Sequence, residues 1–346
     1  MKHQTTRYGE IPFYKIGTFG NTADAFISKK LFLEYKTKYS FPKKGDVLIS
    51  ASGTIGRAVI YDGKPAYFQD SNIVWIDNDE TLVKNDFLFY AYSNVKWNTE
   101  HTTILRLYND NFRNTLIPLP PLNEQSAIAN ILSALDRYLC ALDALILKKE
   151  GVKKPLSFEL LSQRKRLKGF NQTWQRVRLG DIANYLTSNL SAEQITQQGK
   201  IKVYDVNNFI GYTDTTFISD KPYISIVKDG SVGRVRILPP KTNILSTMGA
   251  LIANHRTTTE FLFYLLSNFD FKNFTSGSII PHIYFKDYKE KTIFLPPLNE
   301  QIAIANILSA LDNEITSLKN KKRQFENIKK ALNHDLMSAK IRVLKK

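Results

Sequence analysis

Residues 117–136 are IPLPPLNEQSAIANILSALD, and residues 293–312 are IFLPPLNEQIAIANILSALD. The two stretches differ only at positions 118 and 126 of the first copy, and they lie at a constant offset of 176 residues. Chance does not place two such stretches in one chain, so the sequence contains an internal repeat. The repeat predicts that the chain folds as two related halves.

Each copy predicts the start of a long helix. The Pro-Pro pair near its beginning cannot lie inside a helix, because proline has no N–H to donate. Asn123 and Asn299 then stand where an N-cap is expected, and Glu124 and Glu300 complement the helix dipole. Beyond them, apolar residues recur at spacings of three and four, a narrow seam that favours packing along another helix. The seam residues are Ile128, Leu132, Leu135, Leu139 and Leu142 in the first copy, and Ile304, Leu308, Leu311, Ile315, Leu318 and Phe325 in the second. An ordinary amphipathic helix on a globular core is the alternative.

The first long helix is expected to be interrupted. A helix from Asn123 to about Leu161 would be about 60 Å long, at 1.5 Å per residue. Gly151 and Pro155 lie within it. The missing N–H and the ring of Pro155 predict a kink or a break near the preceding turn.

The repeat extends beyond the helices with lower identity. Val47–Arg57 aligns with Ile224–Arg234, and Asp86–Asn94, a predicted short buried helix, aligns with Glu260–Asn268. The sequence thus predicts a mixed α/β domain followed by a long helix, twice over: residues 1–119 and 120–163, then 164–295 and 296–346. Nothing before Ile11 corresponds to Trp174–Lys200. The contacts that those residues make in the second half must be provided by other residues in the first half.

Composition and charge limit the possible functions of the chain. The chain has 346 residues, a net charge of +16 and a pI near 9.6, which favours a polyanionic partner, nucleic acid first. A generally basic housekeeping protein is the alternative. The lone Cys140 excludes an internal disulfide and predicts a reducing, cytoplasmic location. No apolar run reaches membrane-spanning length, and the first residues are not typical of a signal peptide.

Catalytic motifs are nearly absent from the sequence. It has no dinucleotide fingerprint and no Walker loop, and its five histidines are scattered. Asp24, Glu34 and Lys36 only weakly resemble a nuclease set. The Gly53–Arg57 and Gly230–Arg234 turns suit either a phosphate cradle or a tight hairpin that needs glycine. The sequence therefore predicts a binding protein with no metal or cofactor of its own.

The doubled PLPPLNEQ…AIANILSALD, each copy following a diverged domain, resembles the specificity subunit of type I restriction–modification systems. The C-terminal stretch KNKKRQFENIKKALNHDLMSAKIRV and the turns SGTIGR and Gly277–His282 also resemble that family, so the resemblance covers essentially the whole chain. It implies a non-catalytic chain in which two target-recognition domains each read one half of a split double-stranded DNA site. Two long antiparallel helices would hold the domains apart as a coiled-coil-like spacer.

The same resemblance implies the partners. The helices would dock two methyltransferase subunits, which bind S-adenosylmethionine, and restriction subunits would complete the complex. The implied fold class is α+β, with mixed α/β domains and a pseudo-two-fold repeat. A true dimer matches a palindromic DNA site, and a pseudo-dimer in one chain likewise matches a bipartite site. Because the two domains differ, the site should be asymmetric. Helices of about 60 Å would separate the domains by something near a DNA helical turn.

Basic and amide side chains near turns are the candidates for base and phosphate contacts. In the first domain these are Lys43, Lys44, Arg57, Gln69, Asn72, His101 and Arg106. In the second they are Lys228, Arg234, Arg236, His255, Arg256, Ser278 and His282. Each is equally compatible with a solvated surface role. The predicted partner contacts are Leu132, Leu135, Leu308 and Leu311.

Two other functions remain open at this point. One is a stand-alone DNA-binding regulator without methyltransferase partners, and the other is a nuclease built on Asp24, Glu34 and Lys36. Co-purification from the native host distinguishes them from the first interpretation. Methyltransferase subunits in a two-to-one ratio would favour the specificity subunit, and an isolated DNA-binding chain would favour the regulator.

Overall fold

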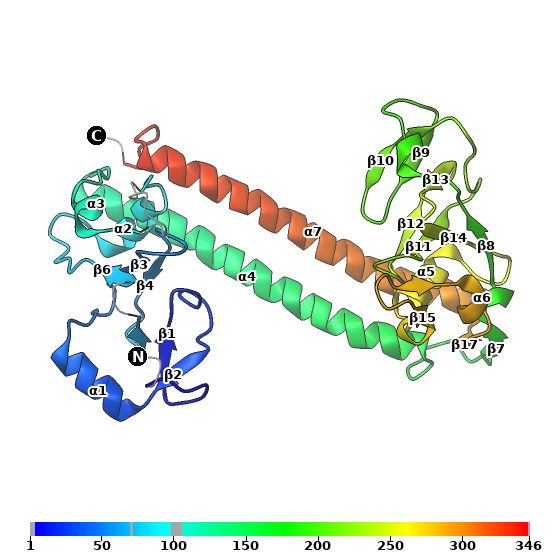
Figure 1. Ribbon diagram of the computed structural model, residues 1–346, viewed down its shortest axis with the longest axis horizontal. Helices are drawn as coiled ribbons and strands as arrows, with labels where there is room; N and C mark the ends of the chain where they lie inside the picture. The colour runs from blue at the N-terminus through cyan, green and yellow to red at the C-terminus, as the bar shows by residue number, and fades with distance from the viewer. Residues whose placement is uncertain (1–3, 70–71, 98–105, 345–346) are drawn as a thin grey trace. The chain divides into compact units, whose positions relative to one another are not determined.

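The computed structural model describes residues 4–69, 72–97 and 106–344, and it contains both long helices that the repeat predicts (Figure 1). Helix α4 spans Leu122–Leu161 and helix α7 spans Leu298–Met337, each 40 residues long. Both begin one residue before the expected asparagine cap. Asn123 and Asn299 therefore lie in the first turn, where each side-chain oxygen accepts a bond from the next amide at 2.9 Å.

The predicted break in the first long helix is wrong. Helix α4 continues through Gly151 and Pro155 to Leu161. Proline removes one amide donor from the helical hydrogen-bond ladder. The Pro155 side chain is exposed, so its ring displaces no core residue. The proline therefore destabilises α4 locally without ending the helix.

The chain divides into two compact units, and each is described here by itself. Unit 1 consists of residues 1–143 and 320–346, and unit 2 of residues 144–319. The division passes through both long helices, so each unit contains part of α4 and part of α7. The four consecutive segments expected from the sequence remain a prediction.

The described residues of unit 1 form two three-stranded sheets. In one, β1 lies between an antiparallel β2 and a parallel β5. In the other, β3 lies between β4 and β6, both antiparallel to it. The strands are β1 Ile11–Tyr14, β2 Ala25–Ile27, β3 Val47–Ser50, β4 Ala58–Ile60, β5 Tyr67–Phe68 and β6 Ile73–Trp75. The short helices are α1 Lys29–Lys38, α2 Asn85–Tyr92 and α3 Asn109–Arg113.

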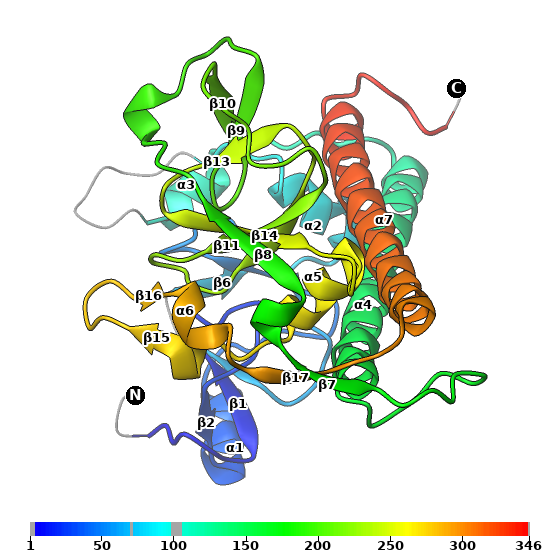
Figure 2. The ribbon, with the colours of Figure 1, turned by 90° about the vertical axis from the view of Figure 1, so that its right-hand side faces the viewer.

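Unit 2 repeats this strand order. Strand β9 lies between an antiparallel β10 and a parallel β13, and β11 lies between antiparallel β12 and β14. These strands are β9 Ile201–Tyr204, β10 Phe209–Thr213, β11 Tyr223–Val227, β12 Val235–Leu238, β13 Thr242–Ile244 and β14 Met248–Ala253. Helix α5, Thr259–Ser267, packs against the β12-β11-β14 sheet (Figure 2).

Unit 2 also has elements without a described equivalent in unit 1. Strand β8, Ala183–Thr187, pairs with the outer edge of β14, and β7, Gln175–Arg178, pairs with β17, Thr292–Leu295. A small hairpin joins β15 and β16. The others are β15 Thr275–Ser276, β16 His282–Ile283 and three 3-10 helices, η1 Leu179–Asp181, η2 Ala192–Gln194 and η3 Lys272–Phe274. Helix α6, Phe285–Tyr288, instead corresponds to α3 at the offset of 176.

Each unit packs a short apolar helix against the long ones. In unit 1, Phe87 and Tyr90 of α2 share a core with Leu132 of α4 and Leu336 of α7. In unit 2, Phe261 and Leu262 of α5 share a core with Leu308 of α7 and Leu160 of α4. Both short helices are therefore buried, as predicted, and Phe87, Tyr90 and Phe261 are core residues.

The long helices are antiparallel within each unit. In unit 1, Lys322 pairs with Asp143 at 2.6 Å, and Phe325, further along α7, packs its ring edge-on against the earlier Tyr138. In unit 2, Lys319 pairs with Glu150 at 2.6 Å, and the earlier Asp312 pairs with the later Lys153. The predicted packing of the two helices on each other is thus present. Across the part of the chain that the structure describes, no helix has the length and apolarity needed to cross a membrane.

Candidate nucleic-acid interface

The repeated glutamine fixes each domain to its long helix. Gln125, which is buried, accepts a bond from the Lys84 amide at 2.8 Å and donates to the carbonyls of Leu82 and Pro120. Its counterpart Gln301 accepts from the Thr258 amide at 3.1 Å and donates to the Arg256 and Pro296 carbonyls. The glutamine of the LNEQ motif thus has the same structural role twice.

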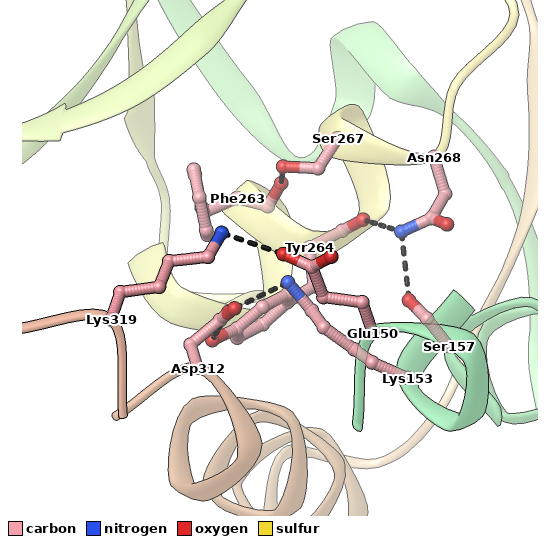
Figure 3. Close-up of polar contacts among 9 residues, drawn as sticks. All are labelled: Glu150, Lys153, Ser157, Phe263, Tyr264, Ser267, Asn268, Asp312 and Lys319. Atoms are coloured by element: carbon pink, nitrogen blue, oxygen red, sulfur yellow. Dashed lines mark hydrogen bonds and ion pairs between the residues drawn. The ribbon is translucent and has the colours of Figure 1, made fainter. Parts of the chain in front are cut away.

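The repeated aspartate ties the short helix to both long ones. In unit 2, the Tyr264 hydroxyl donates to Asp312 at 2.9 Å, and Lys153 pairs with the same carboxylate (Figure 3). The Asn268 amide also donates to the Ser157 hydroxyl at 2.8 Å. Burial, and then the bond to Asp312, raise the pKa of Tyr264 above its ordinary value, so the phenol remains a donor. Asp136, Tyr90 and Lys329 repeat the arrangement in unit 1.

A glycine turn follows the central strand of each second sheet. In unit 1, Gly53 and Gly56 have φ values of 67° and 83°, which favour glycine. A Cβ on Gly56 would lie 2.5 Å from Nε1 of Trp97. In unit 2, Gly230 and Gly233 have φ values of 84° and 80°, and a Cβ on Gly233 would lie 2.6 Å from the Phe271 ring. Each turn therefore packs closely against an aromatic ring.

The turn amides are already paired within the protein. The Gly56 amide donates to the Ser50 carbonyl at 3.0 Å, and the Arg57 amide donates to the Ser50 hydroxyl at 3.0 Å. In unit 2, the Gly233 amide donates to Val227 at 2.9 Å and the Gly230 amide to Pro281 at 2.8 Å. Of the two interpretations of these turns, the geometry favours the tight hairpin over a phosphate cradle built from backbone amides.

Polar side chains gather at the unit 1 turn. The Ser52 hydroxyl donates to Oδ1 of Asn72 at 2.8 Å, and Ser52 forms an isolated β-bridge with Arg106. The guanidinium of Arg57 donates to the Phe19 carbonyl at 2.9 Å. Gln69 lies on the adjoining segment and accepts from the Ile16 amide at 3.1 Å. We call this cluster, residues 52–57 with Gln69, Asn72 and Arg106, the unit 1 turn site.

The equivalent cluster in unit 2 has different side chains. Asp229 forms an isolated β-bridge with His282, and Nδ1 of His282 lies 2.6 Å from Oδ1 of Asp229. The Ile283 amide donates to the Lys228 carbonyl, just as the Leu107 amide donates to the Ala51 carbonyl in unit 1. His282 therefore occupies the place of Arg106. Residues 228–234 with Ser278 and His282 form the unit 2 turn site.

Five candidates lie away from the turn sites. Lys43 and Lys44 precede β3 and so lie at the opposite end of that strand from the turn, where Lys43 pairs with Asp77 at 2.9 Å. His255 and Arg256 follow β14, whose end lies beside the start of β11, and Arg256 donates to Gln175 at 3.2 Å. Arg236 donates to the Asn207 carbonyl at 2.6 Å. DNA contacts by these residues remain predictions, and His101 lies outside the described residues.

Sequence reasoning missed three features of the unit 2 turn site. Asp229, the partner of His282, is acidic and so falls outside the basic and amide side chains selected from the sequence. Ile279 and Ile280 are 91% and 55% exposed on the loop before His282. Tyr284 stacks its ring on that of His282, with centroids 6.5 Å apart. An apolar pair between glycine and proline, SGSIIP, was the available signal for the exposed loop.

The predicted partner contacts need correction. Leu132 and Leu308 have no exposed surface and belong to the cores of units 1 and 2, so no partner can reach them. Leu135 and Leu311 are half-buried. The large apolar side chains that the same helices expose are Leu122, Ile131, Leu145, Leu147, Val152 and Phe158 of α4, and Leu298, Ile302, Ile307 and Ile328 of α7.

The nuclease-like residues are engaged elsewhere. Asp24 pairs with Lys15 at 2.7 Å, and the Lys36 ammonium lies over the rings of Phe32 and Phe41. Within the described ranges, no group of three histidine, cysteine or acidic residues is placed to hold a metal ion. The structure thus provides no assembled hydrolytic centre from this set.

Comparison with known proteins identifies the family. The family model described as "Type I restriction modification DNA specificity domain" matches residues 1–149 and 171–327. This chain belongs to the type I restriction–modification specificity subunits. The two turn sites fall within the matched segments, one in each.

Individual specificity subunits agree with this assignment. A putative type I restriction enzyme specificity subunit of Haemophilus influenzae is 62% identical over 137 residues, which cover 39% of this chain and 36% of that protein. The putative MjaX specificity subunit of Methanocaldococcus jannaschii is 28% identical, over 86% of this chain and 79% of its own. The crystal structure of an S subunit from M. genitalium matches the fold with a TM-score of 0.66 at 20% identity, over 97% of this chain and 91% of that one.

Proposed function

We propose that the chain gives sequence specificity to a type I restriction–modification complex, with each turn site reading one half of an asymmetric bipartite DNA site. The supporting observation is that the two turn sites have equivalent backbones and different side chains. Arg106 can donate two bonds to guanine, whereas the Asp229–His282 pair offers an acceptor that suits the amino group of cytosine. Equivalent positions with different chemistry suit two unlike half-sites.

The charge of the chain supports the same proposal. A net charge of +16 attracts any duplex through its phosphates and leaves the choice of sequence to the turn sites. In this proposal the chain itself performs no chemistry. Two methyltransferase subunits dock on the exposed faces of α4 and α7 and bind S-adenosylmethionine, and restriction subunits join them in the full complex.

A matched pair of charge reversals tests the turn site. Arg234→Glu changes an exposed cation of the unit 2 turn site, and Lys221→Glu makes the same charge change before β11, at the other end of that strand. We expect Arg234→Glu to weaken binding of the cognate duplex by the assembled methyltransferase at least about tenfold, or about 1.4 kcal/mol. Lys221→Glu should change it much less. Equal effects would mean that the turn has no special role.

Salt dependence tests the electrostatic part. The slope of log affinity against log salt concentration should be negative, at about −0.9 per phosphate neutralised. Arg234→Glu should make the slope shallower by about one such step, and Arg106→Ala should mainly relax discrimination at one half-site. A slope near zero would contradict the polyanion role.

Domain exchange tests which unit reads which half. Replacing residues 174–292 with the matching segment of a related specificity subunit should change one half of the methylated sequence and preserve the other. Methylation-sensitive sequencing of the host gives both halves at once. Co-purification with two methyltransferase subunits per chain would separate this function from that of a stand-alone regulator.

A further inference from the structure

Unit 2 contains a strand pair that has no counterpart among the described residues of unit 1. Strand β17 pairs with β7, and residues 116–119 are the unit 1 counterparts of β17 at the offset of 176. The preceding turns match, since the Thr115 amide donates to the Phe112 carbonyl at 3.2 Å and the Lys291 amide donates to the Tyr288 carbonyl at 3.1 Å. Among the residues that the structure describes, no strand pairs with 116–119.

Side-chain exposure reflects this difference. Leu295 of β17 is 4% exposed, whereas its counterpart Leu119 is 55% exposed. Exposure of an apolar side chain to water is unfavourable, and an apolar group that covered Leu119 would remove this cost. The segment that covers Leu295 in unit 2 contributes Trp174, Val177 and Leu179 to the same core.

Among the described residues, unit 1 also has no strand beside the outer edge of β6. Strand β8 covers the outer edge of β14 in unit 2. The counterpart of β14 is β6, whose one described neighbour is β3. In unit 2 a single continuous segment, Trp174–Thr187, provides both missing strands and buries Ile182 and Ala183. One added segment would therefore close both open edges.

A buried carboxylate marks where that segment would begin. Glu300 of α7 is fully buried and accepts two bonds from Arg166 and one from Nε1 of Trp174 at 2.8 Å. Its counterpart Glu124 is 5% exposed and accepts bonds from Arg342, the counterpart of Arg166. Within the described part of unit 1 no indole reaches Glu124, so its carboxylate has room for the donor that Trp174 supplies in unit 2.

The one proline in the segment does not prevent strand pairing. In unit 2 the Leu179 amide donates to the Lys291 carbonyl, so Lys291 and, by antiparallel alternation, Ile293 and Leu295 bond to the added strand. The corresponding unit 1 residues are Thr115, Ile117 and Leu119. Pro118 corresponds to Phe294, whose amide points away from β7, so its missing N–H costs no ladder bond.

We propose that unit 1 carries a strand-docking site, formed by residues 115–119 and the edge of β6, for one extended apolar peptide. The peptide has the chemistry of Trp174–Thr187: an indole for Glu124 and apolar side chains at the positions of Val177, Leu179 and Ile182. Thr6, which precedes β1, bridges Phe26 of β2 through two backbone bonds of 2.9 Å. The added strand binds by β-augmentation. This inference is independent of which DNA sequence the protein reads.

A peptide with the sequence of residues 172–188 tests the site on the full chain. We expect a labelled peptide to bind, measured by fluorescence anisotropy, and to slow hydrogen exchange of the Ile117 and Leu119 amides at least tenfold. Peptides carrying Val177→Pro, which lacks a ladder donor, or Trp174→Ala should bind at least tenfold more weakly. An Arg176→Ala peptide, altered at an exposed position, should bind as well as the parent.

Variants of the chain localise the binding. Leu119→Asp should abolish peptide binding, and Leu33→Asp, the same change at an exposed leucine of α1, should not. Fusing the peptide to the N-terminus through a Gly/Ser linker raises its effective concentration to about millimolar. The fusion should raise the Tm of unit 1, and a Leu179→Asp change in the fused copy should cancel the increase. Protection confined to β14 and β17 of unit 2, or no protection at Ile117 and Leu119 in either format, would overturn the proposal.

Discussion

The carboxylate of Asp136 in α4 contacts the ammonium of Lys329 in α7, and the pair recurs in unit 2 as Asp312 and Lys153. Each aspartate lies 176 residues from its counterpart, and so does each lysine. Helix α4 therefore supplies the aspartate of one pair and the lysine of the other. The two arginine–glutamate pairs obey the same exchange: Arg342 with Glu124, and Arg166 with Glu300. The pseudo-two-fold symmetry is therefore present in individual contacts.

These contacts explain why the helix starts are nearly identical. The repeated glutamate, glutamine and aspartate all bond within the chain, and the repeated leucine is fully buried at both Leu132 and Leu308. Folding alone thus requires the same residues at the same places in both halves. Partner docking is not needed to account for the identity, and it must rest on the exposed side chains of these helices.

The two buried glutamates should differ in their contribution to stability. Glu300→Gln removes the charge that faces Arg166 and Trp174 in a fully buried site, and should cost about 3–5 kcal/mol. Glu124→Gln should cost about 1–2 kcal/mol, because Arg342 is half exposed and can be hydrated. Hydrogen exchange resolved by unit gives both values. Equal costs would show that the Trp174 bond and the deeper burial are unimportant.

Pro155 should be a weak point of α4. Its counterpart is Ala331 of α7, which has the same place in the repeat and is also exposed. Pro155→Ala should stabilise unit 2 by up to about 3 kcal/mol, since it restores an amide donor and a good helix former. The reverse change, Ala331→Pro, should destabilise unit 1 by a similar amount. Urea unfolding measures both, and a destabilising Pro155→Ala would mean that the proline is required.

Buried and exposed positions of α4 should separate folding from partner docking. Leu132→Asp places a charge in the unit 1 core and should cost more than about 4 kcal/mol. Ile131, the adjacent residue, is 38% exposed, so Ile131→Asp should leave the fold intact. Circular dichroism checks the fold, and pull-down of methyltransferase subunits measures docking. Full docking by a doubly substituted Ile131→Asp/Ile307→Asp chain would place the partner surface elsewhere.

The length of the two helices should set the number of unread base pairs. Seven residues inserted after Asp143 and seven after Lys319 fall at the division between the units and preserve the apolar seam. They lengthen each helix by about 10 Å, which corresponds to at most about three base pairs at 3.4 Å each. The methylated motif of a host carrying this variant reports the spacing directly. Insertion into α4 alone should instead disrupt the packing of α4 against α7. An unchanged number of unread base pairs in the double insertion would refute the role of helix length.

Several features were available from the sequence because they depend on local pattern. The offset of 176 residues predicted two related halves, and spacings of three and four predicted α4 and α7. The near-continuous apolarity around Phe87 and Phe261 predicted the short buried helices α2 and α5. Glycine at Gly53, Gly56, Gly230 and Gly233 indicated the turns that became the centres of both turn sites.

Tertiary structure alone decided which residues meet. Arg106 reaches the turn site because a bridge joins it to Ser52 across more than fifty residues, whereas Lys43, closer in sequence, lies at the other end of β3. Helical periodicity marked Leu132 as apolar but did not reveal that α2 and α7 would enclose it completely. The exposed Leu119 likewise resembles its buried counterpart Leu295 in sequence, and only the partner strand distinguishes them. Strand pairing and core packing join distant segments, and no local pattern encodes which segments those are.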